Sequence, residues 1–227
     1  MKELGIANLV GNPTYTTTTL AKEEILDNHR SVLYSFGIST KDNELHRPSL
    51  YWIPKLHKCP FKQSYVVGST KCSTKPLSKL LSCILSAVNT VLQSYCDTSY
   101  SKGGVNQMWI LKNSEDQLEY MQSIQYRSLS SYNSINTFDF STLYITIPHS
   151  KREDKLRELI QLCFIKNNGQ RRYKYLVLGR DRSYLKKKFS ETDIINMLEF
   201  LIDNVVVIFG GSVFQQTYGY KMCSSSR

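Results

Sequence analysis

Hydrophobic residues recur at helical spacing along several stretches of the chain, most regularly after Pro76. Apolar side chains there fall three or four residues apart, which is the spacing of one helix face. They are Leu77, Leu80, Leu81, Ile84, Leu85, Val88, Leu92 and Tyr95. Proline suits the first turn of a helix, where its missing N–H is not needed. The pattern therefore predicts a helix over residues 74–96 with one buried face.

Capping residues predict a helix nearer the N-terminus. Thr19 suits the N-cap, Glu23 and Glu24 suit the first turn, and Gly37 suits the position after the last turn. In the same way Ser114 predicts a short helix over residues 114–124.

Two capped helices are predicted in the C-terminal half. Ser150 and Glu153 form the sequence pattern of a capping box. The helix that they begin is expected to bury Leu156, Leu159, Ile160, Cys163 and Phe164. The second helix is expected over residues 190–204, "SETDIINMLEFLIDN".

The remaining apolar segments are short and favour strands. Residues 47–70 contain two such segments on either side of a basic connection, which predicts a hairpin or two separate strands. Residues 205–217 predict a second hairpin around Gly210 and Gly211. Residues 167–188 combine a turn, a strand and a basic loop. Because helices and strands are mixed without strict alternation, we expect an α+β fold with an antiparallel sheet flanked by helices.

One further strand, over residues 136–147, carries an acidic residue among apolar ones. The apolar positions are Phe138, Phe140, Leu143, Ile145 and Ile147, and Pro148 ends the strand. An ionised Asp139 is costly there unless it is paired or bound to a metal ion. Its position makes Asp139 a candidate functional residue.

Charge and composition narrow the range of partners. The chain of 227 residues is 41% hydrophobic and 21% charged, as in a globular protein, and its net charge of +10 favours a polyanionic partner. Six cysteines without a C-x-x-C pair or a histidine at ligand spacing predict reduced thiols in an intracellular protein, not a zinc site or a disulfide framework. We expect no signal peptide and no transmembrane segment.

Three segments together resemble the reverse transcriptase of Penelope-like retroelements. They are "PSLYWIPKLHK" with "YVVGSTKCSTKPLSKLLSCILSAV", then "SINTFDFSTLYITIPHSK", and then "GGSVFQQTYG". Their order is similar to that of the fingers, the first palm box and the approach to the next palm box. The resemblance implies polymerase fingers and a partial palm over residues 47–219, after an N-terminal helical extension over residues 1–46.

The resemblance also implies an activity and its central residues. Reverse transcriptases copy an RNA template from a DNA primer with deoxynucleoside triphosphates, and two divalent cations assist the phosphoryl transfer. By resemblance, Asp139 and the backbone carbonyl of Phe140 would bind Mg²⁺, and Tyr144 would exclude a ribose 2′-OH. From the residues alone, an aspartate satisfied by neighbouring amides and an ordinary core tyrosine remain alternatives. A nuclear location follows from the family only.

Basic residues are the other expected contacts. Lys55 and Lys58 would meet the triphosphate or the template backbone. A nucleic-acid channel, with Tyr173 and Tyr175 as stacking faces, would be lined by Arg171, Arg172, Lys174, Lys186, Lys187 and Lys188. A solvated basic face is the alternative for both groups.

The chain departs from the family in three places. Ser64 stands where the family has an arginine positioned for the triphosphate, and serine cannot make its bidentate contact. The ending "GYKMCSSSR" replaces a glycine box, so we expect residues 220–227 to be an out-of-frame or misspliced tail. No Asp-Asp pair occurs, although the family uses one for its metal ions. We therefore expect a polymerase fragment with an incomplete palm that is inactive as it stands; the alternatives are a non-catalytic nucleic-acid-binding remnant and an unstable product.

Overall fold

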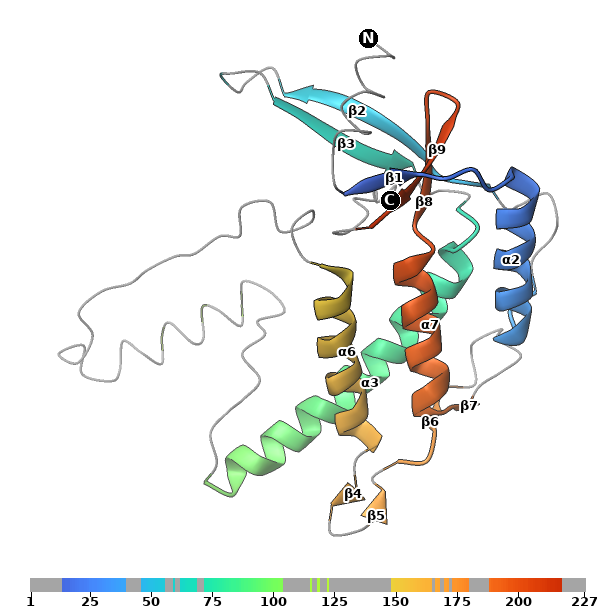
Figure 1. Cartoon of the computed structure of the whole chain (residues 1–227). Coiled ribbons are helices and arrows are strands. Elements are labelled where there is room, and N and C mark those ends of the chain that lie inside the picture. The colour runs from blue at the N-terminus through green and yellow to red at the C-terminus, as the bar shows by residue number, and fades with distance from the viewer. Residues whose placement is uncertain are drawn as a thin grey trace. The chain divides into compact units, whose positions relative to one another are not determined.

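Four helices and a five-stranded sheet give the described part of the chain an α+β fold, as the sequence predicts (Figure 1). The computed structural model describes residues 14–39, 46–55, 59, 62–68, 72–103, 115, 118, 122, 148–164, 166–167, 170–171, 173–179 and 188–217. The chain divides into two compact units, one made of Met1–Asn89 with Thr142–Arg227 and the other of Thr90–Ser141. The main sheet and the cavity discussed below belong to the first unit.

The main sheet has the strand order β1-β9-β8-β2-β3. Its strands are β1 (Tyr15–Thr17), β2 (Ser49–Lys55), β3 (Lys62–Gly68), β8 (Val206–Phe209) and β9 (Ser212–Gln216). Neighbouring strands are antiparallel except β2 and β8, which run parallel with Ser49 opposite Ile208. The expected antiparallel sheet is therefore wrong at this pair. The chain reaches β8 through helix α7 (Glu191–Asp203), and such a crossover permits parallel pairing.

Hairpin β8–β9 closes through the two-residue turn that the sequence predicts. Gly210 and Gly211 have φ angles of 62° and 94°. A turn with two positive φ angles matches the twist of antiparallel strands, and glycine adopts it without a steric penalty. On its other side β9 pairs with β1, so the hairpin lies inside the sheet.

Hairpin β2–β3 is also confirmed, but only its base is joined to the rest of the sheet. Ser49 pairs with β8, whereas the other residues of β2 pair with β3 alone. Pro54 lies in this outer part. Its missing N–H is tolerated there, because this part of β2 has a described neighbouring strand on one side only. Tyr51 and Ile53 are 41% and 46% exposed. The outer half of the hairpin therefore lies away from the core.

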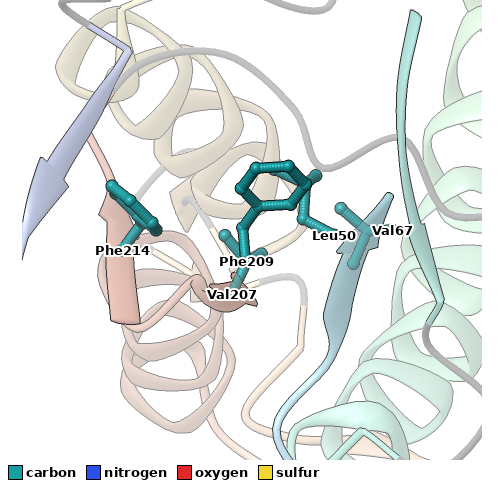
Figure 2. Close-up of a cluster of buried hydrophobic side chains, with 5 residues drawn as sticks. All are labelled: Leu50, Val67, Val207, Phe209 and Phe214. Atoms are coloured by element: carbon teal, nitrogen blue, oxygen red, sulfur yellow. The ribbon is translucent and has the colours of Figure 1, made fainter. Parts of the chain in front are cut away.

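The sheet contains an apolar cluster that joins the base of the β2–β3 hairpin to the β8–β9 hairpin (Figure 2). Its members come from β2, β3, β8 and β9 and are Leu50, Val67, Val207, Phe209 and Phe214. Two pairs face each other across antiparallel strands, Leu50 with Val67 and Val207 with Phe214. Such cross-strand apolar pairs stabilise a sheet and fix its register.

Helix α2 (Lys22–Ser35) begins three residues after the predicted Thr19 cap. Ala21 occupies the N-cap position without a side-chain hydrogen bond, so the Thr19 prediction is wrong. The predicted end is confirmed. Gly37 has a φ angle of 73° and its N–H bonds to the Tyr34 carbonyl, while the Ile38 N–H bonds to the Leu33 carbonyl. These two hydrogen bonds form a Schellman motif. They satisfy carbonyl groups that would otherwise lack a hydrogen-bond donor at the helix end.

Helix α3 (Lys75–Ser101) is longer than predicted and carries Pro76 in its first turn, as expected. The predicted apolar face is buried in the first unit, where Leu77, Leu80, Leu81, Ile84 and Val88 are at most 5% exposed. Tyr95 is 45% exposed, so its predicted burial is wrong. The boundary between the two units falls within this helix, and the buried stripe of the first unit ends before it.

Helix α6 (His149–Phe164) begins directly after Pro148. The Pro148 carbonyl accepts a bond from the Arg152 N–H, so Ser150 lies inside the helix and the predicted capping box is wrong. A proline has no N–H to satisfy, which allows the helix to start immediately behind it. Ile160, Cys163 and Phe164 are buried as predicted, and Arg152 is buried with them; Leu159 is exposed, contrary to the prediction.

Helix α7 packs beside α6 in the first unit (Figure 1). Its predicted cap is present and forms a capping box: the Asp193 N–H donates to Ser190 Oγ, and the Ser190 N–H donates to the Asp193 carboxylate. An ion pair between Arg157 and Glu199 joins the two helices. The Cys163 thiol lies 3.8 Å from the Val88 carbonyl of α3.

Two small ribbons complete the described structure. They pair β4 (Lys166–Asn167) with β5 (Gln170–Arg171) and β6 (Leu176–Val177) with β7 (Lys188–Phe189). Of the helices in the described ranges, none combines the length and the apolar character that a bilayer crossing requires.

Candidate functional site

The residues predicted to form the metal site lie outside the described residues. Asp139, Phe140 and Tyr144 all fall between residues 122 and 148, so the Mg²⁺ site and the predicted sugar contact stay predictions. Among the described residues, no group of three or more His, Cys, Asp or Glu side chains could hold a metal ion.

The predicted fingers lysines are described only in part. Lys55 is the last residue of β2, and its register partner in β3 is Lys62. Lys58 lies outside the described residues. The backbone thus places two basic residues opposite each other at the outer end of the β2–β3 hairpin, and their role stays a prediction.

Only some of the predicted basic residues over residues 171–188 are among the described residues. Arg171 is the last residue of β5, while Arg172, Lys186 and Lys187 lie outside the described residues. Lys174 and Lys188 are exposed. Lys188 is opposite Val177 in the β6–β7 ribbon, and the Lys174 ammonium lies 5.6 Å from the centre of the Tyr175 ring.

Described residues of the first unit line a cavity of about 530 Å³ that is partly open to solvent. It lies where the chain enters the parallel strands β2 and β8, next to the start of α3 and the end of α7. Its wall consists of His29, Arg47, Pro48, Cys72, Ser73, Thr74, Lys75, Ser78, Lys79, Ser82, Arg152, Leu156, Leu198, Leu201, Ile202, Asn204, Val205 and Val206. The Ile208 N–H donates to the Pro48 carbonyl at 2.9 Å, which joins the two strands beside the cavity.

The charges in this wall are all positive. Arg47 comes from the segment before β2, Lys75 and Lys79 from α3, and Arg152 from the first turn of α6. No aspartate or glutamate occurs among the described residues that line the cavity. Serine and threonine hydroxyls near the start of α3 add further hydrogen-bond donors. This wall is chemically suited to an anion.

A buried contact holds the start of α3 against α2. The His29 Nδ1 and Ser73 Oγ atoms lie 2.7 Å apart and share a hydrogen bond. The His29 ring also meets the Phe200 ring of α7 edge to face, with centroids 5.4 Å apart. Both His29 and Ser73 are at most 3% exposed. Rigid neighbours of this kind hold the polar side of the cavity in place.

Two arginines carry buried atoms at this site. Arg152 is only 8% exposed. The Arg47 Nε atom is buried and has no hydrogen-bond partner among the described residues. A buried donor without a partner is costly, and an anion in the cavity would lower that cost.

Acidic residues lie beside the cavity but not in its wall. Burial raises the pKa of Glu153, and the nearby Asp203 and Glu199 raise it further, while Arg152 acts in the opposite direction. One Glu153 carboxylate oxygen is buried without a hydrogen-bond partner among the described residues. The surroundings of Glu153 therefore disfavour its ionised form.

The sequence interpretation missed the cavity, although a pattern in α3 marks it. Lys75, Ser78, Lys79 and Ser82 follow the spacing i, i+3, i+4 and i+7, which places them on one helix face. The apolar face of this helix predicts its burial, whereas its basic, hydroxyl-rich face has the pattern of an ordinary solvated helix face. Arg47 and Arg152 are far away in sequence, so only the fold brings them to that face.

No family model, curated protein or solved structure matches this chain.

Proposed function

We propose that this chain is the fingers and part of the palm of an RNA-directed DNA polymerase of the Penelope-like type. The observation that carries the proposal is the β2–β3 hairpin followed by α3, in the segment whose sequence resembles polymerase fingers. The "FDFSTLY" segment, with Asp139 and Tyr144, supports it from the sequence.

The proposal assigns distinct roles along the chain. Asp139 and the Phe140 carbonyl are the Mg²⁺ ligands, the ion serving to stabilise charge during phosphoryl transfer. Tyr144 excludes ribonucleotides by its size, since a bulky ring leaves no room for a 2′-OH. Lys55 and Lys58 meet phosphates at the outer end of the hairpin. Because the 227 residues contain no Asp-Asp pair, we expect them to bind a template–primer without extending it.

Binding to a template–primer tests this function. An RNA template annealed to a DNA primer should bind more tightly than a DNA duplex of the same length, and the affinity should fall steeply as salt rises. The Lys55→Gln variant should lower the slope of log K against log salt by about 1. Lys151→Gln is the matched control, because Lys151 is an exposed lysine of α6 that lies outside the hairpin.

Two results would contradict the polymerase proposal. One is equal affinity for the RNA–DNA and DNA duplexes, and the other is binding that does not change with salt. Primer extension under the same conditions adds a second readout. We expect no incorporation by the parent chain. Incorporation that persists in the Asp139→Asn variant would contradict the assignment of Asp139 as the metal ligand.

A second candidate function is nucleic-acid binding without catalysis. The rings of Tyr173 and Tyr175 are each 44% exposed, and the Lys174 ammonium lies 5.6 Å from the centre of the Tyr175 ring, which favours this function. Aromatic rings next to cations form stacking platforms for single strands. This candidate predicts tighter binding to single-stranded RNA than to a template–primer, and loss of affinity in Tyr175→Ala. Tyr34→Ala is the control, because Tyr34 is 82% exposed on α2.

A further inference from the structure

The cavity at the start of α3 combines two kinds of surface. Its basic side is formed by Arg47, Lys75, Lys79 and Arg152 together with the hydroxyls of α3. Its apolar side comes from α6, α7 and the start of β8, through Leu156, Leu198, Leu201, Ile202, Val205 and Val206. A ligand that fills both sides must itself have an anionic part and an apolar part.

Size and access fit a small molecule. A volume of about 530 Å³ lies within the range of roughly 300–1,000 Å³ that is typical of small-molecule sites. Ser78, Lys79 and Ser82 are exposed, so the cavity opens to solvent along this face of α3. A ligand can therefore enter without unfolding the unit.

We propose that this cavity binds a nucleoside phosphate. The phosphate groups lie against Arg47, Lys75 and Lys79, where charge-assisted hydrogen bonds are strong. The base and sugar lie against the apolar side chains of α6 and α7. Arginine matches phosphate geometry through its planar group, and the buried Arg47 Nε gains a partner on binding.

This site is separate from the triphosphate contacts expected at Lys55 and Lys58. Ser49, next to the cavity, and Lys55 stand at opposite ends of β2. Six steps along a strand span about 20 Å. The inference therefore does not rest on the polymerase proposal, and the two can fail separately.

The test is a thermal-shift titration of the whole chain with three probes: adenosine triphosphate, adenosine and pyrophosphate. A ligand that binds only the folded state raises the melting temperature in proportion to the logarithm of its concentration. We expect adenosine triphosphate to raise it most, because it alone contacts both sides of the cavity. Equal shifts with pyrophosphate would overturn the assignment of a nucleoside phosphate. The absence of any shift at millimolar nucleotide would overturn the site itself.

Variants locate the binding. Arg47→Gln and Lys79→Glu should each weaken nucleotide affinity by about tenfold or more, because each loses a charged partner. Lys151→Glu makes the same charge change as Lys79→Glu on an exposed lysine outside the cavity, and it should leave the affinity unchanged. Equal losses in Lys79→Glu and Lys151→Glu would show attraction to the overall charge and overturn the site.

One further variant separates this inference from the polymerase proposal. Lys55→Gln should leave nucleotide binding at the cavity intact while it weakens binding to a template–primer. If instead Lys55→Gln abolishes nucleotide binding and Arg47→Gln keeps it, the nucleotide binds at the hairpin and the inference about the cavity is wrong.

Discussion

Two neighbouring regions of the first unit differ in packing and polarity, although β2 and β8 contribute to both. Strands β2 and β8 begin at the cavity and continue into the apolar cluster of Figure 2, so that Pro48 and Val206 line the cavity while Leu50 and Val207 lie in the cluster. The cluster excludes polar side chains. The cavity keeps four basic residues around open space. Open volume and the burial of Arg152 both cost stability, so the cavity stabilises the unit less than the cluster does, and binding of the proposed anionic ligand would offset that cost.

The largest expected effect comes from removing a ring from the cluster. Phe214 is fully buried, and Phe214→Ala should lower the free energy of unfolding by about 3–5 kcal/mol, as is usual for core phenylalanines. Urea denaturation measures the change. Ile53→Ala on the exposed part of the same sheet is the control and should cost less than about 1 kcal/mol. Equal losses in both variants would mean that the cluster is not the centre of stability.

A similar deletion at the cavity should cost less. Leu198 is 5% exposed but borders the cavity, so Leu198→Ala enlarges a space that solvent already reaches. We expect a loss of about 2–3 kcal/mol, at the lower end for buried leucines, since little new enclosed void forms. The measurement is the same denaturation series. A loss as large as that of Phe214→Ala would show that this side of the cavity is as tightly packed as the cluster.

The turn of the β8–β9 hairpin should show a smaller, purely backbone effect. A Cβ added at Gly211 meets no atom within 4 Å, but the φ angle of 94° is unfavourable for any other residue. Gly211→Ala should therefore destabilise the protein by about 1–2 kcal/mol. Gly179→Ala also meets no atom and has no positive φ angle, so it should be neutral or slightly stabilising. If the two variants had the same stability, the positive φ angle at Gly211 would not be a requirement of the turn.

Local chemistry in the sequence predicted most of the fold. The Gly210–Gly211 turn, the capped helix start at Ser190, the Gly37 helix end and the buried stripe of α3 each depend on residues close together in the chain. Two errors were local, the Thr19 cap and the Ser150 capping box, where the helix begins at a neighbouring residue. The largest error arose where distant residues decide. The parallel pairing of β2 with β8 joins residues about 160 positions apart, and no local pattern encodes it.

The candidate sites differ in the same way, since one was proposed from local motifs and the other is formed by residues distant in the chain. The polymerase residues were proposed from motifs, and most of them lie outside the described residues. The cavity was not predicted, because its basic wall joins Arg47, two lysines of α3 and Arg152 through tertiary packing. Only the spacing of Lys75, Ser78, Lys79 and Ser82 was readable in advance, and a polar helix face is commonly a solvated one.

The smallest expected effect concerns charge beside the cavity and depends on pH. Because burial, Asp203 and Glu199 raise the pKa of Glu153 above its ordinary value of 4.5, the folded protein binds this proton more tightly than the unfolded chain does. The free energy of unfolding must then fall as pH rises from 4.5 through the raised pKa. Glu153→Gln removes that loss, so the variant should melt slightly higher than the parent at pH 7, by no more than about 2–4 °C. Below pH 4.5 the two should melt together.

Glu158→Gln is the control for this measurement, because Glu158 is an exposed residue of α6 that pairs with Lys155. Its melting temperature should not exceed that of the parent at pH 7. If Glu153→Gln instead melts lower than the parent at pH 7, the attraction between Glu153 and Arg152 outweighs the cost of burial. The basic wall of the cavity would then be balanced by a protein carboxylate. The need for an anionic ligand would be correspondingly weaker, and the contrast between cluster and cavity would be smaller than the structure indicates.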